Sequence, residues 1–91
     1  MATNICTSKI AYLNADDLLI EPFLSERNAL AEQMFNEGKT EYYPNAIKPL
    51  DTDPARRDWV DHAAAQEFID FVLLNAPTYG ITIVSTSIED L

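Results

Sequence analysis

The sequence contains little of the residue types on which disulfide, metal and phosphate-loop chemistry depends. It has one cysteine, one histidine and two glycines among 91 residues. One cysteine excludes an internal disulfide framework, and one cysteine with one histidine cannot build a Cys/His metal cluster. Gly38 and Gly80 are far apart and form no glycine-rich phosphate loop. No serine has a convincing base, so we predict no catalytic, cofactor-binding or metal-binding residues.

Basic residues are also scarce. Fifteen acidic side chains against six basic ones give a formal net charge of −9. Clustered Lys and Arg side chains bind nucleic acids and anionic membrane surfaces, so we expect neither as a direct partner. The charge is compatible with a protein partner that has a basic surface, and equally with an acidic surface that only confers solubility.

Long apolar runs are absent. The longest, residues 68–74, is interrupted by Asp70 and is too short to cross a bilayer. No apolar leader follows Met1, which favours a cytoplasmic protein. The length is typical of one domain, so we expect residues 1–91 to fold as a single unit.

The first predicted helix covers residues 25–37. Ser25 is its expected N-cap, and Gly38 supplies the left-handed residue after its end. Pro22 is expected to end a short turn over residues 16–20 before this helix. Helical spacing places five residues on the face directed inward: Arg27, Leu30, Ala31, Met34 and Phe35.

The second predicted helix begins after Asp61, which is its expected N-cap, and ends before Pro77. Its inward stripe comprises Ala65, Phe68, Ile69, Val72 and Ala76, broadened by Ala64 and Phe71. This spacing is typical of an amphipathic helix that covers a sheet.

Strands are predicted over residues 4–13, 40–50, 55–61 and 81–88. In the third of these, Arg57, Trp59 and Asp61 alternate with the residues between them. The order of elements predicts an α+β, ferredoxin-like βαββαβ fold: a four-stranded antiparallel sheet with two helices on one face. Its usual strand order is 4-1-3-2, and prolines confine segment 40–50 to an edge, as that order requires.

One segment resembles a known family. Arg57-Asp58-Trp59-Val60-Asp61, followed by Ala63-Ala64-Ala65-Gln66-Glu67-Phe68-Ile69-Asp70-Phe71, is similar to the strand-then-helix segment of dimeric α+β barrel proteins, the antibiotic-biosynthesis-monooxygenase-like group. Small proteins of tailed bacteriophages carry similar segments. The resemblance implies a homodimer whose sheets pack face to face and bury Trp59. If the second face of the sheet is apolar, such a dimer would cover apolar surface that a monomer would expose.

The enzymes of that group use Asn, Trp and His or Tyr side chains around a pocket between helices and sheet. This chain has Asn4, Trp59 and His62, but His62 lies much closer to the tryptophan in sequence than the histidine of the haem-degrading branch. The resemblance therefore does not carry that activity. His62 beside Asp58 and Asp61 could act as a general base, but an exposed position in the first helical turn is the expectation.

Several residues are candidates for contact with a partner. Tyr42 and Tyr43 lie on the expected edge strand, where one of the two rings would face outward. Trp59 is either the core anchor or the centre of a dimer interface. Among the carboxylates, Glu32, Glu67 and Asp70, together with Glu26 and Glu37, could imitate phosphate spacing. The acidic turn residues Asp51, Asp53, Asp58 and Asp61 match no calcium loop.

These observations favour a non-catalytic, acidic interaction protein, a phage-type accessory factor that binds or inhibits a host or defence protein in the host cytoplasm. The alternative is a cofactor-free oxygenase, isomerase or small-ligand binder of the dimeric α+β barrel group. The two hypotheses differ in one structural feature, because an enzyme needs a concave apolar cavity with convergent polar groups.

Overall fold

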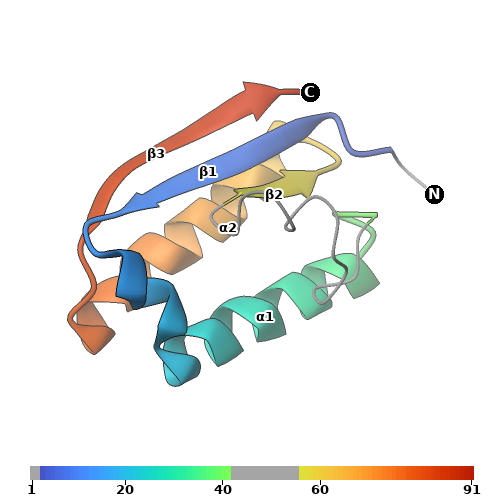
Figure 1. Cartoon of the computed structure of the whole chain (residues 1–91). Coiled ribbons are helices and arrows are strands. Elements are labelled where there is room, and N and C mark those ends of the chain that lie inside the picture. Colours follow the sequence, from blue (N-terminus) through green and yellow to red (C-terminus); the bar gives the residue numbers. More distant parts are fainter. Residues whose placement is uncertain (1–2, 42–55) are drawn as a thin grey trace.

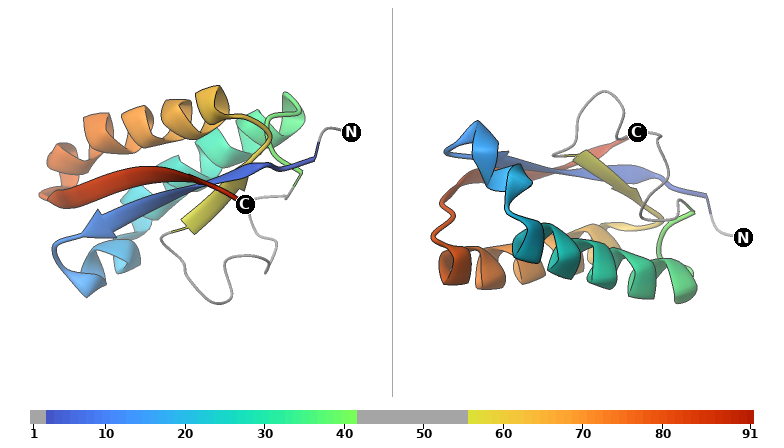
Figure 2. Two further views of the ribbon diagram at one scale, coloured as in Figure 1. Left: turned by 90° about the horizontal axis from the view of Figure 1, so that it is seen from above. Right: turned by 60° about the horizontal axis from the view of Figure 1, so that its bottom comes forward.

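The computed structural model describes residues 3–41 and 56–91. Within them, a three-stranded antiparallel sheet carries two helices on one face (Figures 1 and 2). The elements are β1 (Cys6–Tyr12), the 3-10 helix η1 (Ala15–Leu19), α1 (Glu21–Asn36), β2 (Arg56–Trp59), α2 (His62–Asn75), the 3-10 helix η2 (Ala76–Tyr79) and β3 (Ile83–Asp90).

The sheet has the order β2-β1-β3, and the central strand β1 is antiparallel to both neighbours. This confirms the α+β class. β2 and β3 correspond to the third and fourth predicted strands. Read from β3 to β2, the observed order is therefore 4-1-3 of the predicted order 4-1-3-2, so a ferredoxin-like arrangement is compatible with it. A fourth strand is not seen among the described residues, because most of the predicted strand 40–50 lies outside them.

Helix α1 begins earlier than the sequence predicts. Its first residue is Glu21 and its N-cap is Ile20, so the prediction that Ser25 caps it and that Pro22 precedes it was wrong. Proline is well tolerated in the first helical turn, where its missing N–H has no intrahelical acceptor. The predicted C-terminal glycine is confirmed, since Gly38 has φ 80°.

Helix α2 follows the prediction closely. The Asp61 carboxylate accepts a hydrogen bond of 2.7 Å from the Ala64 N–H, which confirms the cap. After α2, the Ile81 N–H donates to the carbonyl of Ala76 over 3.0 Å, and the Ile81 side chain is buried. Strand β3 therefore starts at Ile83, two residues later than predicted. Within the described ranges, no helix is both long and apolar enough to span a membrane.

The core lies between the helices and the sheet, and Trp59 is one of its largest fully buried side chains. The Trp59 Nε1–H donates to Ser8 Oγ over 3.0 Å, and its ring centroid lies 5.1 Å from that of Phe68. The ring is completely buried within a single chain. The structure thus places Trp59 in the core of its own domain, where a second chain cannot reach it.

The opposite face of the described strands is polar. Lys9 Nζ lies 2.7 Å from a Glu89 carboxylate oxygen. Arg56 Nε lies 3.2 Å from Asp58 Oδ1 and 3.2 Å from Thr7 Oγ1. An apolar second face was the reason for expecting a homodimer, and that reason does not hold for these strands.

Candidate functional site

Two arginines are buried between the helices and the sheet. Arg27 lies on the inward face of α1, one turn after Phe23, and is 3% exposed. Arg57 alternates with Trp59 on β2 and is 7% exposed. The guanidinium carbon of each lies 5.7 Å from the centroid of the Phe68 ring. The Phe68 ring of α2 thus lies near two positively charged side chains, one from α1 and one from β2.

Within the part of the chain that the structure describes, these two guanidinium groups lack the partners that buried charges usually have. Among the described residues, neither has a carboxylate oxygen within 4.0 Å, and the Nε of each has no hydrogen-bond acceptor. Burial, and then the charge of Arg27, lower the pKa of Arg57 to about 10. Burial also lowers the pKa of Arg27. Both shifts express a cost of keeping the guanidinium charged.

Tyr12 adds a third unpaired polar group. Its ring meets Phe23 edge to face at 6.0 Å, and its hydroxyl oxygen is buried without a partner among the described residues. Burial raises the pKa of Tyr12, and the charges of Arg27 and Arg57 oppose that shift. Tyr12, Arg27 and Arg57 therefore belong to one electrostatic cluster, which we call the arginine cluster.

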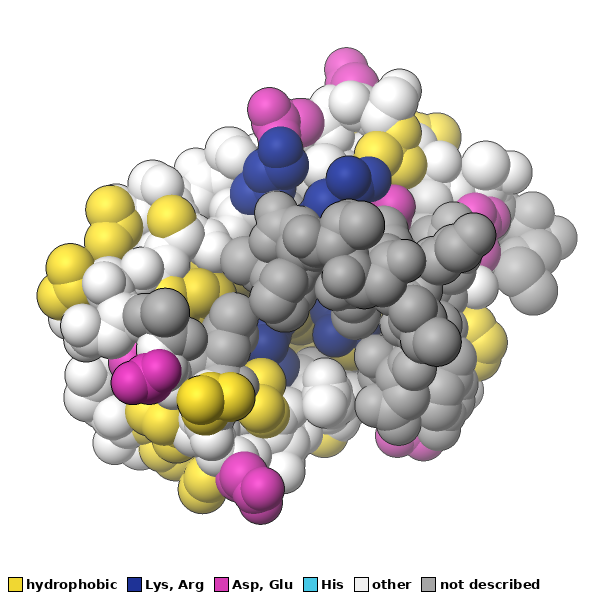
Figure 3. All heavy atoms as spheres, viewed as in Figure 1, with side chains coloured by type: hydrophobic (Ala, Val, Ile, Leu, Met, Phe, Trp, Pro, Cys, Tyr) yellow, Lys and Arg dark blue, Asp and Glu magenta, His cyan; other side chains and the backbone are white. Residues whose placement is uncertain are grey.

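The other described cations are placed differently. Each has a carboxylate beside it: Lys9 has Glu89, Arg56 has Asp58, and Lys39 has both Glu37 and Glu67. In the space-filling view, dark-blue Lys and Arg side chains in the upper part of the molecule touch magenta carboxylates (Figure 3). Among the described residues, the two most buried cations are thus the two that have no carboxylate beside them.

The second candidate region is the outer edge of β3. Among the described residues, no strand pairs with this edge. The Leu91 N–H donates to the carbonyl of Ile5, and Cys6 faces Asp90 in the register. Because hydrogen-bonded and non-bonded pairs alternate in an antiparallel ladder, Thr86 and Ile88 direct their backbone N–H and C=O groups away from β1.

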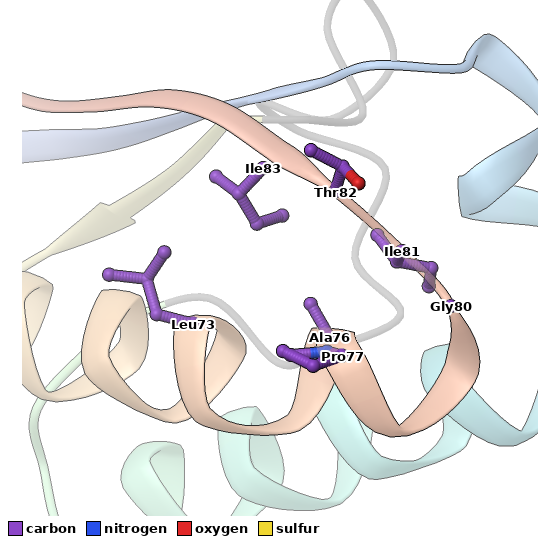
Figure 4. Close-up of a pocket in the computed structure, with 7 residues that line it drawn as sticks. All are labelled: Leu73, Ala76, Pro77, Gly80, Ile81, Thr82 and Ile83. Atoms are coloured by element: carbon purple, nitrogen blue, oxygen red, sulfur yellow. The ribbon is translucent and has the colours of Figure 1, made fainter.

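An apolar groove of about 420 Å³ runs beside the start of this edge. It is lined by Leu73, Ala76 and Pro77 and by residues 80–83. In Figure 4, Leu73 rises from α2 and Ile83 descends from β3 toward the space between them. Leu73, Leu74 and Val84 are exposed nearby, at 43%, 77% and 61%. The edge and the groove together form a surface that we call the β3 edge surface.

A smaller groove of about 300 Å³ lies between the two helices, lined by residues that include Glu26, Gln33, Phe71 and Asn75. One Glu26 carboxylate oxygen is buried there without a partner among the described residues. A hydrogen bond to Glu26 is the main cause of the raised pKa of Tyr79. Glu26 is the one carboxylate among the described residues that line this groove.

The histidine is not arranged as a general base with an aspartate of its own turn. His62 Nε2 lies 2.7 Å from Asp90 Oδ1, on exposed side chains. Asp58 is buried and contacts Arg56, and Asp61 caps α2. Across the described ranges, no three His, Cys, Asp or Glu side chains come together as metal ligands would.

The predicted contact residues are scattered. Tyr42 and Tyr43 lie outside the described residues, as do Asp51 and Asp53. The other predicted carboxylates lie on the two helices. Glu32 is exposed on α1. On α2, Asp70 Oδ1 accepts a hydrogen bond of 2.8 Å from Gln66 Nε2, and Glu67 Oε1 lies 2.8 Å from Lys39 Nζ. Glu67 and Glu37 share one lysine, which reduces their value as an imitation of phosphate charge.

The arginine cluster was not predicted from the sequence, although two features of the sequence indicate it. Arg27 occupied a position in an apolar helical stripe, and Arg57 alternated with a tryptophan. A charged side chain at a position directed inward is rare, and it is usually paired with an opposite charge. Comparison with known proteins adds nothing to these observations, because no family model, no curated protein and no solved structure matches the chain.

Proposed function

We propose that this protein is a small, non-catalytic interaction protein whose β3 edge surface receives an extended, basic segment of another protein. The observation that carries the proposal is the eight-residue strand β3, whose outer edge is unpaired among the described residues and lies beside an apolar groove. An added strand gains main-chain hydrogen bonds from such an edge, and alternate side chains enter pockets beside it.

The composition of β3 supports this use of the edge. Proteins protect exposed edges with proline, lysine or short strands, and β3 has none of these features. A basic segment is the occupant we expect, because the net charge of −9 attracts it and steers its approach. Two copies of the chain repel each other at low ionic strength, so the homodimer predicted from the sequence is the rival outcome.

The test uses a proline that blocks the outer edge alone. Thr86→Pro removes an N–H that points away from β1, so the β1–β3 ladder keeps its hydrogen bonds. Thr86→Ala is the matched control, because it shortens the same side chain and keeps the N–H. A partner purified on immobilised wild-type protein should bind Thr86→Ala as it binds wild type and bind Thr86→Pro at least about tenfold more weakly, as expected for the loss of one or two buried hydrogen bonds.

The result can also go against the proposal. Equal affinity for the proline and alanine variants would show that the partner binds elsewhere. A monomer–dimer equilibrium that Thr86→Pro shifts to monomer would identify a second copy of the chain as the occupant. For a basic partner, the reversal Glu32→Lys with Glu67→Lys should slow association and reduce its salt dependence.

The proposed role as a phage-type inhibitor of a host or defence protein is one form of this function. It needs a basic surface on the target and no catalytic group on this chain. The likeness to the dimeric α+β barrel group supports the fold more than the activity, because His62 contacts Asp90 on the surface and not a pocket between helices and sheet.

The complete fold we propose is the ferredoxin-like βαββαβ arrangement, in which segment 40–50 adds a fourth strand beside β2. Helix and strand order, and the position of β1 between β2 and β3, support it. In that arrangement β3 remains an outer strand. Cross-strand nuclear Overhauser contacts between segment 40–50 and β2 would test it, and contacts with β3 would contradict both the fold and the open edge.

A further inference from the structure

We infer that Arg27, Arg57 and Tyr12 form a binding site for a phosphate group between α1 and the sheet. The three side chains come from α1, β2 and β1, and all three present buried polar atoms that have no hydrogen-bond partner among the described residues. The guanidinium carbons of both arginines lie 5.7 Å from the centre of the Phe68 ring.

The burial of these two charges has a cost in free energy. A buried charge without a partner is unfavourable, and natural proteins pair such charges or bind a counter-ion to them. This chain has fifteen carboxylates, yet none of the described ones lies within 4.0 Å of either guanidinium. The contacts with Phe68 stabilise the positive charges but accept no hydrogen bond from the in-plane N–H groups.

The neighbouring carboxylates that the structure describes do not already serve as the counter-ion. Asp17 is buried near Tyr12 and raises its pKa, but its Oδ2 accepts from the Asn14 backbone N–H over 3.3 Å as part of the η1 cap. Glu26 stands next to Arg27 in sequence, and its hydrogen bond is to Tyr79.

The charge and the donor groups of the cluster match a phosphate group. Two guanidinium charges balance the charge of about −1.5 to −2 that a phosphate monoester carries near neutral pH. Each guanidinium offers a planar fork of N–H donors that suits phosphate oxygens, and the Tyr12 hydroxyl offers a further donor. A single carboxylate would leave one of the two arginines uncompensated. A nucleic-acid backbone is the wrong ligand, because the rest of the acidic surface repels a long polyanion.

The test follows the arginine side chains directly. Inorganic phosphate is titrated into the wild-type protein, with chloride at matched ionic strength as the control, and the Nε–Hε resonances of the arginines are observed by NMR. We expect saturable shifts for Arg27 and Arg57, and none for Arg56, whose Nε already contacts Asp58 and Thr7. O-phosphoserine as a second ligand distinguishes a phosphate monoester from free phosphate as the preferred form.

Variants give the same answer independently. Arg57→Gln should weaken phosphate binding about tenfold or more, because it removes a charged donor from the ligand. Arg56→Gln, one residue away and on the other face, should leave the affinity unchanged. Thr86→Pro should leave it unchanged as well, so failure at the β3 edge and failure at this site can be told apart.

Two results would overturn the inference. One is that neither phosphate nor phosphoserine causes a saturable shift of the Arg27 and Arg57 Nε–Hε resonances, and that any small shift is the same with chloride. The other is a shift of the Arg27 and Arg57 resonances in Asp51→Asn or Asp53→Asn protein without added phosphate, which would mean that the chain supplies its own counter-ion.

Discussion

The two strands that flank β1 differ in almost every respect. β2 has four residues, and Arg57, Asp58 and Trp59 are all buried. β3 has eight residues, of which only Ile83 and Ile88 are even half-buried. Both strands pair with the same central strand, so the backbone ladder does not cause the difference. For Arg57 and Trp59 it comes from side chains that β2 directs toward the helices.

The β2 side is held by side-chain hydrogen bonds as well as by the ladder. Thr7 Oγ1 and Ser8 Oγ each donate to the carbonyl of Arg57 over 3.2 Å, and Thr40 Oγ1 donates to that of Asp58 over 2.9 Å. The described polar side-chain contacts of β3 are exposed ones, between Lys9 and Glu89 and between His62 and Asp90. Local opening should therefore be rarer around β2 than around β3, which leaves β3 adaptable enough to accept another strand.

The largest effect should come from the core anchor of the β2 side. Trp59→Ala should lower the free energy of unfolding by about 3–5 kcal/mol, because it empties a fully enclosed site and removes the hydrogen bond to Ser8. Val84→Ala on β3, where the side chain is 61% exposed, should change it by less than about 0.5 kcal/mol. Urea denaturation measures both. Similar losses would show that the two edges are equally important to stability.

Adjacent arginines of β2 should give effects of opposite sign. In phosphate-free buffer, Arg57→Met should raise the free energy of unfolding by about 1–4 kcal/mol, because a buried charge is exchanged for an apolar chain of similar length. Arg56→Met should lower it, because Asp58, whose side chain is 5% exposed, then loses its cation. Thermal denaturation of both variants is the measurement. A loss of stability in Arg57→Met as large as in Arg56→Met would argue that Arg57 has an internal partner.

Local signals in the sequence predicted much of the fold. The cap at Asp61 and the apolar stripe of α2 depend on neighbours in sequence, and both are confirmed. The start of α1 was not predicted correctly, because a proline interrupts a helix at an interior position but is tolerated in the first turn, where Pro22 lies. The start of β3 was missed because Ile81 hydrogen-bonds back to η2, which the β-branched composition does not reveal.

The candidate site was harder to predict for a physical reason. The position of Arg27 in an apolar stripe indicates burial, but only tertiary packing brings it to the ring that Arg57 also contacts. Which edge stays open likewise depends on the order of the strands. The prolines of segment 40–50 drew attention to one edge of the predicted sheet, whereas β3 forms the other.

The smallest effect concerns the lysine that joins the end of α1 to the β2 side. The Val60 N–H donates to the Lys39 carbonyl over 2.9 Å, and Lys39 Nζ lies 3.1 Å from Glu37 and 2.8 Å from Glu67. Hydrogen bonds from Lys39 and then Gln33 lower the pKa of Glu37 from its ordinary value of 4.5. A carboxyl group with a lowered pKa in the folded state contributes stability above its unfolded value, and this contribution is lost as the pH falls through the folded value.

The melting temperature should therefore fall slightly less steeply below pH 4.5 in Glu37→Gln than in wild type. Lys39→Gln should reduce the same slope. The double variant should add little, because both changes remove the contact between Lys39 Nζ and the Glu37 carboxylate. The effect should shrink in high salt, since the side chains of Lys39 and Glu37 are 36% and 42% exposed. An additive double variant would mean that Glu37 and Lys39 contribute to the acid sensitivity separately.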